Sequence, residues 1–168
     1  MEGLKARRGD LSGPVLAILV TLILLAIGAV IIAYFTLLAG PAPAPVLVVR
    51  DQPIAYKGTG SPPDAKVEVV VANVGTAQVA LDNANTKLRI VSPSGLVTAL
   101  GGGAEVSLGA TGTTTIAPGE SKTLTFTFTG AWSNFASYRV AGAVLTLKDT
   151  AGNTIGQFEV SIRIVSSS

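Results

Sequence analysis

The stretch "GPVLAILVTLILLAIGAVIIAYFTLLAGPAPAPV" (residues 13–46) decides how this chain folds. Residues 15–38 carry no formal charge, and a helix of that length spans about 36 Å. Because the hydrocarbon core of a bilayer is about 30 Å thick, this segment predicts one membrane-spanning helix. The alternating prolines that follow, in residues 39–46, forbid a continued helix and favour an extended, semi-rigid spacer.

The apolar segment is expected to stay on the mature protein. A cleavable secretory signal has an apolar core of only about 7–15 residues and a small-residue cut site. The segment here is longer, and "YFTLLAGP" (residues 34–41) makes a poor cut site. Lys5, Arg7 and Arg8 precede it, and positive residues remain on the cytoplasmic side. We therefore expect the C-terminal part of the chain to lie outside the cell.

Composition argues against nucleic-acid binding and against most enzyme chemistry. Residues 1–9 hold three basic residues and one acidic residue, which accounts for the whole net charge of +2. The other 159 residues are balanced, and no basic cluster marks a nucleic-acid-binding face. The chain contains neither Cys nor His, which removes the thiolate nucleophile, the commonest general base and the usual zinc ligands. We expect no enzyme activity, no cofactor and no metal.

From residue 46 onward the apolar residues alternate with period two, which is typical of strands with one buried and one exposed face. The segments "KVEVVVANV" (66–74), "TKLRIV" (86–91), "SKTLTFTFTG" (121–130) and "GQFEVSIRIV" (156–165) show it most clearly, and residues 46–50 predict a further short strand. The positions expected to face inward are Val67, Val69, Val71, Leu88, Ile90, Leu124, Phe126, Phe128, Phe158, Val160, Ile162 and Ile164.

Turn-forming residues separate these runs. Residues 92–95 ("SPSG"), 117–120 ("APGE") and 149–153 ("DTAGN") all carry turn chemistry. Seven or eight short strands at near-regular spacing predict an antiparallel immunoglobulin-like sandwich over residues 46–168. The predicted fold class is α+β, with a long N-terminal hydrophobic α-helix followed by an all-β Ig-like antiparallel head.

Two local features admit more than one interpretation. Asp149 and Asn153 could suggest calcium, but the alternating acidic ligands of a calcium loop are absent and a hairpin turn is favoured. The segment "GAWSNFASY" (130–138) gathers Trp132, Phe135 and Tyr138. These aromatic residues either pack in the core at a corner of the sheet or form an exposed surface contact.

The N-terminal motif carries a family resemblance. The segment "KARRGDLSGPV" (5–15) places a basic leader and a glycine just before the apolar run, and it resembles the class III signal of type IV pilins, especially archaeal ones. The resemblance implies cleavage between Gly9 and Asp10, with Arg7 and Arg8 recognised in the leader. Pro14 stands where bacterial pilins carry a glutamate five residues into the mature chain, which fits the archaeal branch better.

The resemblance implies a domain plan and a function. Residues 1–9 would be the cleaved leader, 10–38 the helix that spans the membrane in the precursor and then enters the filament core, 39–45 a linker, and 46–168 the head. The chain would be a structural subunit of an extracellular adhesive filament. The residues expected to make the helix contacts are Val15, Leu16, Leu19, Leu22, Ile23, Ile27, Val30, Ile31, Tyr34 and Phe35.

The implied partners are further copies of the chain in a helical filament, the prepilin peptidase, the pilus assembly machinery and, for the precursor, the cytoplasmic membrane. Nucleic acid is not among them. The alternative is a single-pass membrane anchor that carries an extracellular Ig-like binding module and does not polymerise.

Overall fold

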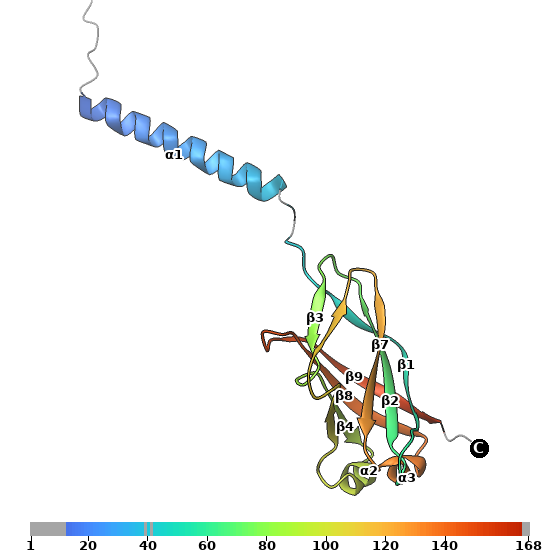
Figure 1. Ribbon diagram of the computed structural model, residues 1–168. Helices are drawn as coiled ribbons and strands as arrows, with labels where there is room; N and C mark the ends of the chain where they lie inside the picture. The colour runs from blue at the N-terminus through green and yellow to red at the C-terminus, as the bar shows by residue number, and fades with distance from the viewer. Residues whose placement is uncertain (1–12, 39, 41, 166–168) are drawn as a thin grey trace, which may run out of the picture. The chain divides into compact units, whose positions relative to one another are not determined.

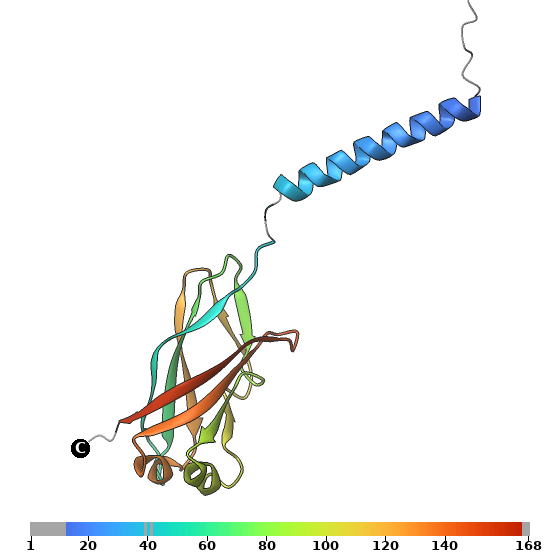
Figure 2. The same ribbon diagram turned by 180° about the vertical axis from the view of Figure 1, so that it is seen from behind.

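The structure is a computed structural model that describes residues 13–38, 40 and 42–165. The chain forms two compact units, Met1–Ala42 and Pro43–Ser168. The division falls inside the proline-rich segment, residues 39–46. We describe the helix and the head separately (Figures 1 and 2).

The first unit contains the helix α1 (Gly13–Leu38). Its 26 residues correspond to about 39 Å at 1.5 Å per residue. Pro14 stands in the first turn, where a missing backbone N–H breaks no helical hydrogen bond. None of the residues of α1 is buried by its own unit.

The second unit is a mostly β head domain with two short helices (Figure 1). One sheet has seven strands in the order β5-β4-β8-β9-β1-β2-β7, and a second sheet pairs β3 with β6. The strands are β1 (Leu47–Lys57), β2 (Ala65–Asn73), β3 (Val79–Asp82), β4 (Lys87–Ser92), β5 (Glu105–Ser107), β6 (Thr113–Ile116), β7 (Ser121–Phe128), β8 (Val140–Lys148) and β9 (Thr154–Val165). The short helices are α2 (Ser94–Ala99) and α3 (Trp132–Ala136).

The large sheet is curled, so that its two edge strands β5 and β7 come into contact. The curl encloses one core, and this confirms the sequence prediction of an apolar helix followed by a β-rich domain. The predicted purely antiparallel pairing is wrong at one place, because β1 and β9 run parallel. The segment 92–95 is also more than a turn, since Pro93 caps the start of α2.

Strand β1 is longer than the predicted 46–50 because it continues through a bend. Its register with β2 shifts between Arg50 and Ile54, and Asp51 has a backbone φ of 59°. Before the bend β1 pairs with β2 alone, whereas after it residues 54–56 also pair with β9. The bend lets one strand contact both halves of the curled sheet.

The predicted alternation of buried and exposed positions is confirmed along β2, β4 and β7. Their expected inward residues are all buried. In β9, Ile162 and Ile164 are buried, whereas Phe158 and Val160 are half-buried and pack against the edge of the core. The reason is that β1 does not cover this part of β9, since the two strands pair only through residues 54–56 and 163–165.

Candidate assembly helix and docking surfaces

The perimeter of α1 is the first candidate functional surface. The ten expected contact residues are all exposed in the single chain. At 100° per residue they cover about 220° of the helix circumference, which is too wide for contact with one neighbour. A helix that is apolar on all sides needs lipid or several similar helices around it.

The two threonine side chains of α1 are adapted to an apolar environment. The hydroxyl of Thr21 donates to the carbonyl oxygen of Ala17 at 2.8 Å, and that of Thr36 donates to the carbonyl of Ile32 at 2.9 Å. Both hydroxyl protons are therefore satisfied within the helix and need no water. This removes the desolvation cost that an unpaired hydroxyl would carry in lipid or in a protein core.

A shallow apolar hollow lies on α1 beside Gly28, bordered by Thr21, Leu24, Leu25 and Ile32. All four of these bordering residues are absent from the expected contact set. The absence of a side chain at Gly28 is the sequence signal that could have pointed to them, because small residues let helices approach closely.

Within the described residues, α1 is the one helix long and apolar enough to cross a membrane. Length and composition fit a membrane anchor and also fit a signal sequence near the N-terminus. The leader residues Arg7, Arg8, Gly9 and Asp10 lie outside the residues that the structure describes.

Residues 43–46 are fastened to the head rather than free. The carbonyl of Ala44 accepts the N–H of Thr76 at 3.0 Å, and the N–H of Val46 donates to Asn73 Oδ1 at 3.3 Å. A Cβ at Gly75 would collide with the backbone of Ala44 and Val46, so glycine is required for this close approach. The loop after β2 thus clasps the start of the head.

Asn73 is the centre of this clasp and is completely buried. Its Nδ2 donates to the carbonyls of Ala77 at 2.7 Å and Ile116 at 3.2 Å, and its Oδ1 also accepts the N–H of Gly75 at 3.0 Å. One amide side chain therefore links the start of β1, the loop after β2 and the end of β6. Sequence analysis did not single out this residue.

The aromatic segment belongs to the core, which decides between its two interpretations. Phe135 is fully buried, Trp132 is 9% exposed and Tyr138 is half-buried. The rings of Phe128 and Phe135 lie with centroids 5.2 Å apart. The surface-contact alternative is wrong for Trp132 and Phe135, because α3 turns both side chains into the end of the curled sheet.

The carboxylates whose pKa values are lowered accept hydrogen bonds within turns. Hydrogen bonds from the Asn153 side chain and backbone hold the pKa of Asp149 below its ordinary value, in the hairpin between β8 and β9. The side chain of Asn85 does the same for the pKa of Asp82 in the turn after β3. In the described part of the chain, no group of three acidic, His or Cys residues could hold a metal ion.

No protein-family model matches this chain, and no curated protein matches it either. Among solved structures, a Bordetella pertussis crystal structure solved under the name ApaA shows 12% identity and a TM-score of 0.37. The match covers 73% of this chain and 98% of that one. A likeness this weak carries no argument about function.

Proposed function

We propose that this protein is a structural subunit of an extracellular pilus-like filament, built by bundling of the α1 helices with the head domains outside. The observation that carries the proposal is a 26-residue helix that is apolar on its whole perimeter and has no buried residue. The leader motif at residues 5–15 supports it, because removal of the charged tip would free the helix to leave the membrane.

The head is proposed to be an Ig-like sandwich. The curl of the large sheet supports this, because its edge strands β5 and β7 come into contact and the sheet folds over one core. Such heads bury their apolar faces between two layers and leave the outer faces for contact with neighbours and surroundings.

Assembly in this proposal is a change of environment for α1. Full enclosure of a large aliphatic side chain contributes roughly 1.5–3 kcal/mol relative to water, and α1 has more than a dozen of them. This gain holds the assembled helix away from water. It largely vanishes relative to lipid, so exchange of lipid for other helices depends on close packing.

The alternative is a single-pass anchored module that stays monomeric. The same helix supports it, since length and apolarity do not distinguish the two. Cleavage of the leader distinguishes them, because an anchor gains nothing from losing its cytoplasmic charges.

The decisive experiment is mass spectrometry of the mature N-terminus, combined with electron microscopy of cells that express the chain. A mature chain that begins at Asp10 within filaments supports the proposal. A Gly9→Glu variant is expected to keep its leader and to lose filaments, whereas a matched Asp10→Asn variant is expected to be processed. An intact Met1 on a membrane-resident monomer would exclude the filament and support the anchor.

A further inference from the structure

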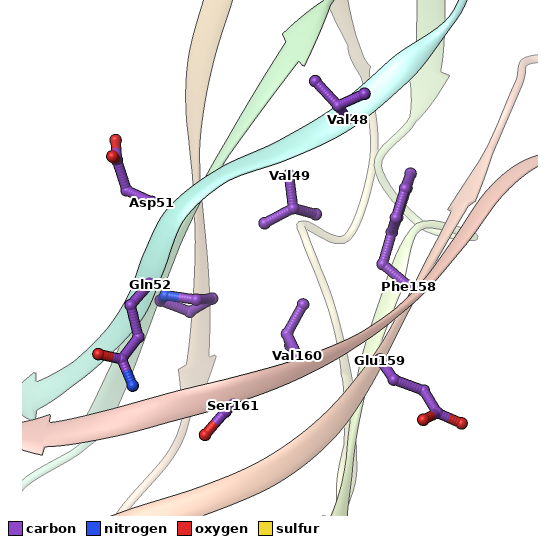
Figure 3. Close-up of a pocket in the computed structure, with 9 residues that line it drawn as sticks. Val48, Val49, Asp51, Gln52, Phe158, Glu159, Val160 and Ser161 are labelled. Carbon is purple, nitrogen blue, oxygen red and sulfur yellow. The ribbon is translucent and has the colours of Figure 1, made fainter.

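Strands β1 and β9 form a groove that no element of the described chain fills. They pair only through residues 54–56 and 163–165, and toward the start of each strand, before that short ladder, they diverge. An open groove of about 490 Å³ lies between them, next to Val49 on one wall and Val160 on the other (Figure 3).

The wall formed by β9 presents free backbone groups. The N–H of Ile164 donates to the carbonyl of Arg139, so even-numbered residues of β9 direct their backbone groups toward β8. Gln157, Glu159 and Ser161 therefore direct their N–H and C=O groups toward the groove. The ladder between β1 and β9 does not reach these three residues.

The opposite wall, formed by β1, also has backbone groups that point into the groove. The N–H of Val74 donates to the carbonyl of Val46, so the alternate residues Val48 and Arg50 direct their backbone groups toward β2. Val49 lies between them and directs its backbone groups away from β2, toward the groove. Both walls thus offer the hydrogen-bonding pattern that an extended peptide satisfies.

The side chains of the groove define what such a peptide would carry. Figure 3 shows Val49, Phe158 and Val160 pointing into the space between the two ribbons, and all three are half-buried apolar residues. Asp51 and Glu159 form the exposed rim of the groove, and Figure 3 shows their side chains pointing away from the space between the ribbons. No Lys or Arg lines the groove, and neither rim carboxylate belongs to an ion pair within the described residues.

We propose that this groove binds an extended segment of another polypeptide by strand addition to β9. The segment has apolar residues at every second position, which cover the valines and Phe158. It has Lys or Arg between them, on the outer face that also carries the carboxylates of Asp51 and Glu159. The chain's own linker does not fit, because its prolines lack N–H groups and residues 44 and 46 are fastened to the loop after β2. This proposal does not depend on filament formation.

The test uses the full chain in detergent micelles and a capped hexapeptide, Thr-Val-Lys-Val-Lys-Val. Backbone NMR follows amide exchange with and without the peptide. Without it, the amides of Gln157, Glu159 and Ser161 are expected to exchange quickly, whereas those of Phe158 and Val160 are protected by β8. Addition of the peptide is expected to slow exchange at the first three at least tenfold.

Two N-methylated peptides identify the bonding mode. One carries methyl groups on the valine amides and the other on the threonine and lysine amides, so each blocks one edge of the strand. Strand addition predicts that one of them loses binding and the other keeps it. Loss of binding by both would show that the peptide also bonds the β1 wall at Val49, and equal binding by both would overturn strand addition.

Substitutions in the protein test the rim. Glu159→Gln keeps the backbone N–H and removes the charge, and we expect binding to weaken about 2- to 5-fold. Glu105→Gln, on the remote strand β5, is the matched control and should leave the peptide affinity unchanged. Unchanged exchange rates at the amides of Gln157, Glu159 and Ser161 in millimolar peptide would refute the proposal. Protection that appears without peptide and grows with protein concentration would also refute it, in favour of a second copy as occupant.

Discussion

At the residue scale, the buried amide of Asn73 joins three separate parts of the head. It satisfies two carbonyls and two N–H groups at once, from Ala77, Ile116, Val46 and Gly75. Asn73→Ala leaves these groups without partners in a site closed to water. We expect the free energy of unfolding to fall by about 2–4 kcal/mol, measured by denaturant titration with tryptophan fluorescence.

The control for this prediction is Asn85→Ala. Asn85 is exposed and its side chain bonds only the neighbouring carboxylate of Asp82. A change within about 0.5 kcal/mol is expected. If both substitutions destabilise the head equally, the clasp around Asn73 is not what holds residues 43–46 to the head.

The turn carboxylate Asp149 makes stability depend on pH. Hydrogen bonds from the side chain and backbone of Asn153 lower its pKa in the folded head below the 3.8 of an unperturbed group. A depressed pKa contributes stability that is fully present above the unfolded-state pKa and is lost as the pH falls through the folded-state pKa. The free energy of unfolding, measured from pH 6 downward, should therefore fall below about pH 4. It should fall less steeply in Asp149→Asn. A variant with the unchanged slope would contradict this.

At the element scale, the short helix α3 closes one end of the curled sheet through Phe135. This residue is fully buried and its ring packs on Phe128. Phe135→Ala removes that contact and leaves a cavity, so we expect a loss of about 3–5 kcal/mol in unfolding free energy. Thr123→Ala on the exposed face of β7 is the control and should change it little. A small loss for Phe135→Ala would mean that the end of the sheet collapses onto the gap.

The elements differ in how far the sequence predicts them. Strands β2, β4 and β7 were predictable because each alternates apolar and polar residues over a full strand length. The second half of β1 was not, since "DQP" at residues 51–53 breaks the alternation and its parallel partner β9 is more than 100 residues away. The helix α1 follows from composition alone. The groove beside Val49 has no motif, because it arises from two strands that diverge.

At the scale of the whole molecule, α1 is expected to tolerate no charge at its middle. Within residues 13–38 no acidic side chain could pair with an introduced lysine. Ile23→Lys should cost about 2.5–3.5 kcal/mol in membrane insertion and should abolish filaments if the proposed function holds. The matched control Ile23→Leu should keep both membrane insertion and filament formation. Membrane fractionation and electron microscopy measure the two effects separately, and filaments that carry Ile23→Lys would exclude α1 from the filament core.

The head should fold without the helix, because its core cluster runs from Leu47 to Ile164 and contains no residue of α1. A fragment that begins at Pro43 keeps the backbone bonds of Ala44 and Val46, and we expect it to unfold within about 0.5 kcal/mol of the full chain in detergent. A fragment that begins at Leu47 loses these bonds and leaves Asn73 Oδ1 without its partner at Val46. Its free energy of unfolding should therefore be lower by about 1–3 kcal/mol. Both fragments share the same core, so the difference between their free energies of unfolding measures the contribution of residues 43–46. Equal stability of the two fragments would show that the clasp contributes nothing, and a full chain markedly more stable than both would show that the helix supports the head.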